Sequence, residues 1–196
     1  MHRRDIIKKL LLGTSLTFGG GGLWAFETKP SPVLINKVQS NSLYLFTKVL
    51  QWVPLVDLPK VVQDLGFTGI DIAVRGNGHF QVKELKEKLP QLVASSQSLG
   101  MEPPILTTEL TGENIRDMDE FLRIVSGEGL KHYRLGWVKY KSNEVMKDLN
   151  AFNSQFKNLA ELHQKYQVQG HYQNHTGSGV GGSVWELLYL LEGILR

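Results

Sequence analysis

The stretch LYLFTKVLQWVPLVDLPKVVQDLGFTGIDIAV, residues 43–74, contains a strand pattern, a helix pattern and a second strand pattern in succession. Asp57 precedes the helix pattern in the N-cap position, and Gly66 follows it in the C′ position, where glycine commonly ends a helix. Two strands joined by one helix typically run parallel in a single sheet. The stretch therefore predicts a β–α–β unit, with strands at 43–50 and 69–74.

The same alternation continues along the chain, with further strand patterns at 103–110, 131–138 and 168–174. Apolar residues spaced three and four apart predict helices over 115–125 and 143–167. Pro90 is expected to open another helix over 90–100, after a separate turn or two at 82–89. Units of about 30 residues that alternate strand and helix favour a parallel sheet with helices outside it.

Alternate side chains of a strand face opposite sides of a sheet. In the strand at 69–74, Ile70, Ile72 and Val74 form an apolar face suited to packing against helices. The opposite faces of three strands and the residues after them gather Asp71, Ala73 and Arg75, then Ile105, Thr107 and Glu109, then Gln169, His171, Gln173 and His175. These faces become more polar toward the carboxyl ends of the strands, as the interior of a barrel with a site at its mouth would.

Composition excludes several classes of function. The chain of 196 residues has no cysteine, which excludes disulfides, thiolate catalysis and zinc–cysteine sites. Its net charge of +3 arises in residues 1–26, which hold four of the 22 basic groups and one of the 19 acidic groups. Residues 27–196 are therefore about neutral, and we expect no nucleic-acid partner.

The first 26 residues differ from the rest, with a basic start, an apolar run and a glycine cluster. This pattern is typical of an export signal, and the adjacent Arg3 and Arg4 resemble a twin-arginine signal. A basic amphipathic tail is the alternative. Residues 27–42 are polar, contain two prolines and are expected to be a linker, leaving a domain at 43–196. We expect an exported, periplasmic protein with no membrane span once the signal is removed.

Four segments, GIDIAVRGNGH (69–79), PPILTTEL (103–110), YRLGW (133–137) and YQNHTGSGVGGSVWELLYLL (172–191), occur in an order that resembles the sugar phosphate isomerase/epimerase group of xylose isomerase-like TIM barrels. The resemblance covers the chain from about Leu43 onward. It implies a (β/α)₈ barrel, a small sugar or sugar phosphate as ligand, and a divalent metal (Mn²⁺, Mg²⁺ or Zn²⁺) bound by Glu, Asp, His and Glu of the last four strands.

The chain departs from the family pattern in two respects. Gln173 stands where the family has its first metal-ligating glutamate, and an uncharged amide oxygen is a weak ligand. Five strand patterns are present instead of eight, so we expect a partial (β/α)₈ barrel of about five β/α units. We expect either a piece of a longer protein or a natural short form whose remaining wall comes from a second molecule, with self-association through the open sheet edges.

Two residues are candidates for catalysis. His175 ends the last strand pattern, shares a face with Gln173, and precedes a glycine-rich loop, 176–182, whose backbone N–H groups could bind an anion. Glu109 ends the third strand and is the carboxylate we expect to act as a base, unless an acid of the strands not present here does so; its other alternative is a surface carboxylate. His171 is expected deeper in the barrel, His132 near its closed bottom, and His163 on a buried helix face as a structural residue.

Six residues are candidates for binding substrate: Lys48, Trp52, Arg75, His79, Trp137 and Gln173. Arg75 could hold a phosphate or carboxylate, or else pair with Asp71 or Glu109. Lys48 could bind an anion or polarise a carbonyl. Each tryptophan could stack on a sugar ring or belong to the core. His79 follows two glycines in a loop and is either a site residue, as the resemblance implies, or simply solvated.

Two functions follow from this pattern. The first is a sugar isomerase or epimerase that moves a proton next to a carbonyl through an enediolate, with metal or cationic assistance. In that case, these residues alone are not expected to complete the catalytic site. The second is a non-catalytic carbohydrate-binding or partner-binding barrel in which Gln173 marks the loss of a metal ligand.

Overall fold

The computed structural model describes residues 41–175, 177 and 179–194, all of which belong to one compact unit, Ser40–Arg196. The predicted export signal and most of the predicted linker lie outside the described residues, so both stay predictions. Within the part that is described, no helix combines the length and the apolar character needed to cross a bilayer.

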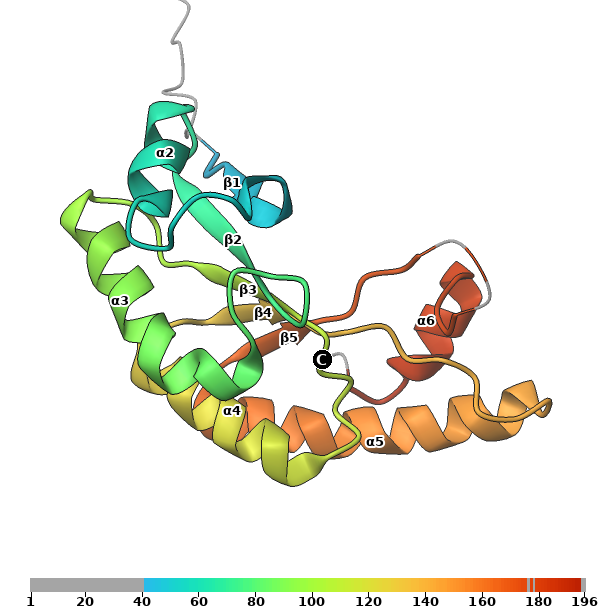
Figure 1. The fold of residues 1–196 in the computed structure, drawn as a ribbon. Helices are drawn as coiled ribbons and strands as arrows, with labels where there is room; N and C mark the ends of the chain where they lie inside the picture. Colours follow the sequence, from blue (N-terminus) through green and yellow to red (C-terminus); the bar gives the residue numbers. More distant parts are fainter. Residues whose placement is uncertain (1–40, 176, 178, 195–196) are drawn as a thin grey trace, which may run out of the picture. The chain divides into compact units, whose positions relative to one another are not determined.

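The strands form one parallel sheet in the order β1-β2-β3-β4-β5, so each strand pairs with its neighbour in the sequence (Figure 1). They are β1 (Tyr44–Phe46), β2 (Gly69–Val74), β3 (Ile105–Thr108), β4 (His132–Arg134) and β5 (Gln169–His171). A parallel sheet in strict sequence order is the arrangement of a TIM-barrel wall. The predicted α/β fold with five strand–helix units is confirmed.

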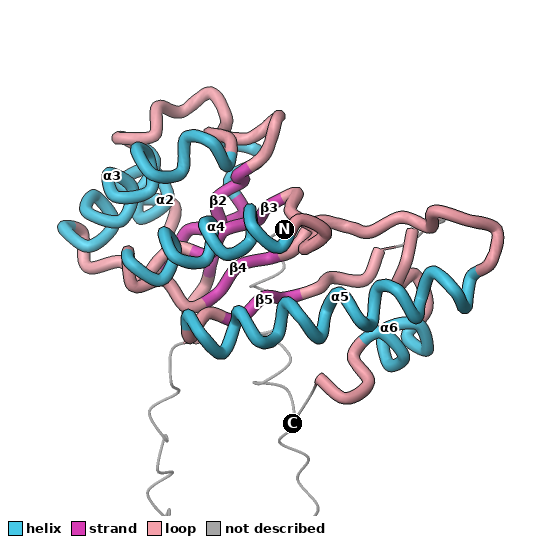
Figure 2. Tube along the Cα trace, turned by 90° about the horizontal axis from the view of Figure 1, so that it is seen from below, coloured by secondary structure: helices cyan, strands magenta, loops and turns pink. Residues whose placement is uncertain are grey.

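The α-helices are α2 (Leu58–Asp64), α3 (Leu85–Ser98), α4 (Ile115–Gly127), α5 (Val145–Tyr166) and α6 (Val184–Leu190), with 3₁₀ turns η1 (Thr47–Leu50) and η2 (Val82–Glu84). Figures 1 and 2 show α3, α4 and α5 following one another along one side of the sheet. We call the opposite side of the sheet the inner face. The short α6 packs on α5 through a separate apolar cluster that includes Phe152 and Leu190.

Several predicted elements differ from the structure, since the strands predicted at 43–50, 103–110, 131–138 and 168–174 are all shorter and the helix around Pro90 begins earlier. The first strand ends at Phe46, and residues 47–50 form η1, because the hydroxyl of Thr47 turns back to donate to the backbone oxygen of Asp71 (3.2 Å). Pro90 lies inside α3 and does not open it. Leu85, Leu89 and Leu92 are all buried, so one apolar stripe continues through the proline and outweighs the loss of one N–H donor.

The main core lies between the sheet and the helices. Ile70, Ile72, Val74, Leu106 and Tyr133 are fully buried there, which confirms the apolar strand face predicted at 69–74. Alternation then directs Asp71, Thr107, Arg134 and His171 to the inner face. These polar side chains therefore stay out of the apolar core between the sheet and the helices.

His163 of α5 has the structural role expected from its position. The hydroxyl of Tyr133, in β4, forms a hydrogen bond of 2.8 Å with Nε2 of His163. Burial, with a smaller effect from His171, lowers the pKa of His163 to about 4, so the ring is neutral and can accept this bond. Gly170 of β5 makes the contact possible, because a Cβ there would lie 2.7 Å from the His163 ring.

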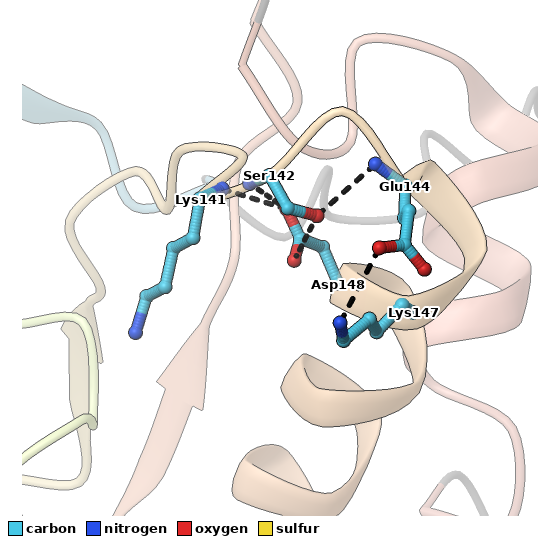
Figure 3. Close-up of polar contacts among 5 residues, drawn as sticks. All are labelled: Lys141, Ser142, Glu144, Lys147 and Asp148. Atoms are coloured by element: carbon cyan, nitrogen blue, oxygen red, sulfur yellow. Dashed lines mark hydrogen bonds and ion pairs between the residues drawn. The ribbon is translucent and has the colours of Figure 1, made fainter.

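The start of α5 is held by a buried carboxylate (Figure 3). Asp148, 7% exposed, accepts hydrogen bonds from the backbone N–H groups of Lys141 (2.6 Å) and Ser142 (2.8 Å) and from the hydroxyl of Ser142 (3.0 Å). The same hydroxyl accepts from the backbone N–H of Glu144 (3.0 Å). These bonds lower the pKa of Asp148, the one from the Ser142 backbone most, and fix the loop between β4 and α5.

We predict that Asp148→Asn lowers the thermal unfolding midpoint at pH 7 by a few degrees, because an amide cannot accept all three bonds. The carboxyl pKa is depressed in the folded state, so its contribution is present above the ordinary carboxyl pKa and lost as the pH falls. The difference between wild type and variant should therefore shrink toward acid pH. Asp64→Asn, which alters an exposed pair with Lys60, is the control and should change the midpoint little. Equal effects of the two variants at pH 7 would contradict the assignment.

Gly136, which follows β4, lies against the backbone that follows β3. Its backbone N–H donates to the oxygen of Leu110 (2.7 Å), and a Cβ at this position would lie 2.4 Å from the backbone oxygen of Glu109. Real Cβ atoms do not approach backbone so closely. A side chain here would push apart the two strand ends that border the inner face.

Gly136→Ala is expected to reduce the free energy of unfolding by about 1 to 3 kcal/mol, because the clash is with backbone and cannot be relieved by rotating a side chain. Gly127→Ala is the matched control, since a Cβ at Gly127 meets no atom within 4 Å. The control should be neutral or stabilising by up to about 1 kcal/mol, since Gly127 is the last residue of α4. The measurement is urea unfolding of both variants. An unchanged free energy of unfolding in Gly136→Ala would refute the close approach.

Candidate functional site

A hollow of about 460 Å³ lies at the carboxyl ends of the strands. We call it the mouth hollow, and its lining residues are Phe46, Lys48, Asp71, Arg75, Thr107, Arg134, Trp137, Gln173 and His175. They come from all five strands or from the segments that directly follow them. Five of the predicted substrate-binding and catalytic residues are therefore brought together here: Lys48, Arg75, Trp137, Gln173 and His175.

The polar centre of the mouth hollow is a carboxylate on β2. The pairing of β2 with β3 places Thr107 opposite Ala73, and the Thr107 hydroxyl donates to Oδ1 of Asp71 over 2.6 Å. Burial raises the pKa of Asp71, while the Thr107 bond and the charges of Arg134 and Arg75 work in the opposite direction. A half-buried carboxyl with a raised pKa, held by a hydroxyl and beside cations, suits proton transfer better than a solvated carboxylate does.

Arg134 ends β4 and lies next to this carboxyl group. Its Nη1 donates to the side-chain oxygen of Gln173, and its guanidinium carbon lies 5.0 Å from the ring centre of Trp137. Burial lowers the pKa of Arg134 most, Asp71 raises it, and Arg75 lowers it. The Nε atom of Arg134 is buried and has no hydrogen-bond partner among the residues described.

An aromatic pair forms the side of the mouth hollow nearest β5. The ring centres of Trp137 and His175 lie 4.4 Å apart, and the indole N–H of Trp137 donates to the backbone oxygen of Gln173 (3.2 Å). Trp137 remains 39% exposed, which leaves part of its ring accessible to a ligand. Aromatic rings of this kind stack on the apolar faces of sugars, so the side chain is well placed for the predicted role.

His79 has a different environment from the one predicted. Its Nε2–H donates to the backbone oxygen of Leu50 (3.1 Å), and its Nδ1 lies 3.4 Å from the hydroxyl of Thr47. Burial lowers the pKa of His79, partly offset by the bond to Leu50. Both ring nitrogens thus tie the loop after β2 to η1, and the ring is outside the lining of the mouth hollow.

Glu109 and Trp52 also lie outside that lining. Glu109 is exposed, and its backbone packs against Gly136. Trp52 is 77% exposed and follows η1. The predicted base and one predicted stacking residue are therefore not brought to the other candidates.

A second hollow, of about 640 Å³, lies deeper along the inner face and shares Asp71, Arg134 and Gln173 with the first. His132 and His171 meet in it, with His132 Nδ1 3.1 Å from His171 Nε2. Burial, and then the nearby His132, lower the pKa of His171. His132 precedes Arg134 on β4 and so lies farther from the mouth, as the sequence predicts.

The described residues do not fit a divalent-metal site. Gln173 stands where the sequence resemblance would place a metal ligand, yet its side-chain oxygen accepts a hydrogen bond from the cationic Arg134, and a metal ion there would be repelled. The described part of the chain also holds no cluster of three or more histidine or acidic side chains suited to a metal.

The glycine-rich segment before α6 already has its own carboxylate. The backbone N–H of Gly181 donates to Oε2 of Glu186 over 2.7 Å, and the N–H of Trp185 donates to the hydroxyl of Ser183 (3.2 Å). These are the kinds of donor that the sequence suggested for an external anion. Residues 176 and 178 of the segment lie outside the described residues.

Asp71, Thr107 and Arg134 are the site residues that sequence reasoning did not select. Asp71 and Thr107 were placed on the polar strand faces, but their pairing depends on the register between β2 and β3. Arg134 follows the buried Tyr133 in β4, so alternation along the strand could have predicted that Arg134 faces inward.

Comparison with solved structures shows which known folds are similar to this one. No protein-family model matches the chain, and no curated protein matches it either. Among solved structures, it is similar to 3-keto-D-glucoside 4-epimerase from E. coli, with a TM-score of 0.57 and 10% identity over 73% of this chain and 60% of that one.

Two further similar structures have related titles. D-Allulose 3-epimerase from Methylomonas sp., in complex with D-allulose, matches with a TM-score of 0.55 and 12% identity over 78% of this chain and 58% of that one. A xylose isomerase domain protein from Alicyclobacillus acidocaldarius matches with a TM-score of 0.55 and 13% identity over 78% and 59%. The chain thus spans about 60% of the length of these structures.

The resemblance inferred from the sequence is thereby confirmed at the level of the fold. A TIM-barrel wall has parallel strands in sequence order, helices on its outer side and polar groups at the carboxyl ends of the strands. The described part of this chain has these three features. The described residues from 43 onward thus have a fold similar to part of these solved barrels.

Proposed function

We propose that the protein binds a sugar in the mouth hollow and, as a sugar isomerase or epimerase, moves a proton on the carbon next to a carbonyl. The observation that carries this proposal is the half-buried carboxyl of Asp71, held by Thr107 and flanked by Arg134, in a fold shared with sugar epimerases. D-Allulose is bound by one of those epimerases. A hollow of about 460 Å³ is large enough for a monosaccharide.

Binding of the sugar is assigned to the rim of the hollow. Trp137 offers a partly exposed aromatic surface, and Gln173 offers its amide group to sugar hydroxyls. Gln173 is itself held by Arg134, and Trp137 is held through the backbone of Gln173. These bonds fix the polar groups before the ligand arrives, which lowers the entropic cost of binding.

Proton transfer is assigned to Asp71. Its carboxylate takes the proton from the carbon, and the electron pair of the broken C–H bond moves to the carbonyl, giving an enediolate. The cationic side chains of Arg134 and Lys48 stabilise the negative oxygen that forms. Delivery of a proton to the other face of the same carbon, from water or a second acid on that face, gives an epimer. Return of the proton to the neighbouring carbon, with transfer of the hydroxyl proton between the two enediolate oxygens, gives an isomer. A raised pKa favours a carboxyl group that must both take and return the proton.

The predicted base was Glu109, so the two carboxylates can be compared directly. We predict that Asp71→Asn in the 1–196 chain reduces exchange of the ketose C–H proton for solvent deuterium by at least about 100-fold. The amide keeps an oxygen that can accept from Thr107, so the fold should persist. Glu109→Gln, the matched control, should change the rate less than about threefold, because Glu109 is exposed and outside the hollow.

The measurement is proton NMR in D₂O with a panel of D-ketohexoses that includes D-allulose, together with thermal unfolding of each variant. Loss of exchange in Glu109→Gln with retention in Asp71→Asn would return the base to Glu109. Sugar binding by the wild type without any exchange would overturn proton transfer while leaving the binding site in place. A wild type that neither binds nor exchanges any of these sugars would refute the whole proposal.

A further inference from the structure

Epimerisation needs a proton donor that Asp71 cannot supply by itself. The reacting carbon of an enediolate is planar, so a proton removed from one face must be replaced from the opposite face to give the epimer. Asp71 belongs to β2 and reaches such a carbon from one side only. A group that serves the other face must therefore come from another strand, unless water acts in its place.

The deeper hollow of about 640 Å³ holds a suitable group on β5. Asp71 and His171 both line this hollow, together with Arg134. The pairing of β4 with β5 aligns Arg134 with His171, and the strand order puts β4 between β2 and β5. The charge of Arg134 also acts on Asp71. A ligand held at Arg134 therefore has a carboxyl group on one side and an imidazole on the other.

Arg134 can hold the oxygen next to the reacting carbon. It lines both hollows, so a sugar that enters at the mouth can reach Arg134 and Asp71 together. A guanidinium carries five N–H donors, and among the described residues that of Arg134 makes one hydrogen bond, from Nη1 to Gln173. Its other donors can stabilise the carbonyl oxygen as negative charge develops there.

The ring of His171 is held in place by a second histidine. Nδ1 of His132 lies 3.1 Å from Nε2 of His171, and the two ring centres are 5.2 Å apart. With Nε2 engaged, Nδ1 is the ring nitrogen of His171 left for a ligand. The residue is exposed along the inner face, so a sugar can approach this nitrogen. A ring oriented through one nitrogen can transfer a proton through the other.

We propose that His171 is a second proton-transfer residue, which serves the face of the reacting carbon opposite to Asp71 and makes the protein an epimerase. This inference rests on the proposed function, because it adds a residue to the same reaction. In one direction, the Asp71 carboxylate takes the proton and the C–H electron pair moves toward the carbonyl oxygen. The imidazolium of His171 then gives its Nδ1 proton to the opposite face, its N–H electrons stay on nitrogen, and the carbonyl re-forms.

The reverse direction uses the same two groups with their protonation exchanged. Neutral His171 takes the proton through Nδ1, and protonated Asp71 gives its own proton to the other face of the carbon. The two groups hold one proton between them before each reaction and one after it. Exchange with solvent restores the starting form, so no further reactant is required.

The surroundings of the two groups make their proton affinities more alike. Removal from water raises the pKa of Asp71, against the effects of Thr107, Arg134 and Arg75. Removal from water, and then the nearby His132, lower the pKa of His171. The charged pair and the neutral pair therefore differ less in free energy than the same groups do in water, which favours transfer in both directions.

The test follows the 1–196 chain by NMR in D₂O with two pairs of D-ketohexoses that differ only at C3. These are D-fructose with D-allulose, and D-tagatose with D-sorbose. Two rates are measured for each sugar: entry of deuterium at C3 of the recovered substrate, and formation of the C3 epimer. The wild type should show both rates with at least one pair.

His171→Gln should lower epimer formation by at least about 100-fold from either member of that pair. In the member whose C3–H faces Asp71, deuterium entry should stay within about threefold of the wild-type rate, because Asp71 still takes the proton and returns a deuteron. In the other member, both rates should be lost. Asp71→Asn should show the reverse pattern, with exchange lost in the first member and kept in the second. A purely structural role of His171 would slow both members equally.

Gln169→Ala is the matched control, because Gln169 is an exposed residue of the same strand, two positions before His171, and lies outside the linings of both hollows. Its rates should equal those of the wild type. Thermal unfolding of each variant verifies that the fold is kept, and His171→Asn replaces His171→Gln if the latter does not fold.

The possible failures are distinguishable. If His171→Gln forms the epimer at the wild-type rate, or slows exchange equally in both members of the pair, the assignment of His171 is wrong and the proposed function stands. If the wild type exchanges the C3 proton and forms an isomer without any epimer, the assignment fails in the same way. If the wild type exchanges no ketose proton, the assignment and the proposed proton transfer are both overturned.

Discussion

The pairing of β2 with β3 is the contact on which the candidate site depends. It aligns Asp71 with Ile105 and Ala73 with Thr107, so that the Thr107 hydroxyl reaches the Asp71 carboxyl across the two strands. A one-residue shift of β2 would turn Asp71 toward the helices and bring Ile72 to the inner face, and the same shift of β3 would turn Thr107 away and bring Leu106 inward. The fully buried Ile70, Ile72 and Leu106 prevent this, because such a shift would expose them.

The same alternation extends to β4 and β5. Tyr133 is buried among the helices and bonds to His163, so its neighbours His132 and Arg134 must face inward. Core packing on one face of the sheet thereby determines which polar groups meet on the other. Gln173 shows the chemical result, since its amide oxygen is the partner of Arg134. An arginine–amide pair can orient a ligand, but it supplies no negative charge that would bind a metal cation.

Much of this arrangement follows from the sequence, and the limit is physical. Alternation predicts the apolar strand faces. The position just after a strand end predicts that Lys48, Arg75, Trp137, Gln173 and His175 gather at one edge of the sheet. Beyond the last paired residue of a strand, however, alternation no longer sets the direction of a side chain. Glu109 and His79 lie in such segments, and their environments depend on a close contact with Gly136 and on bonds to Leu50 and Thr47.

The site residues that lie within strands were not selected from the sequence, because long-range contacts bring them together. Asp71 and Arg134 lie within strands and are about 60 positions apart in the chain. No local sequence pattern therefore indicates that they are neighbours. Pro90 was misjudged similarly, since long-range burial of α3 outweighs its local preference. In each case, tertiary contacts decided what local chemistry left open.

The central claim is that ligand binds on the inner face beside Trp137. The most direct test follows the indole N–H signals of ¹⁵N-labelled protein by NMR while D-fructose or D-fructose 6-phosphate is added. The account predicts that the Trp137 signal shifts with saturation, while those of Trp52 and Trp185, which are 77% and 75% exposed and outside the mouth hollow, stay in place. A saturable shift of Trp52 or Trp185 with none at Trp137 would contradict it.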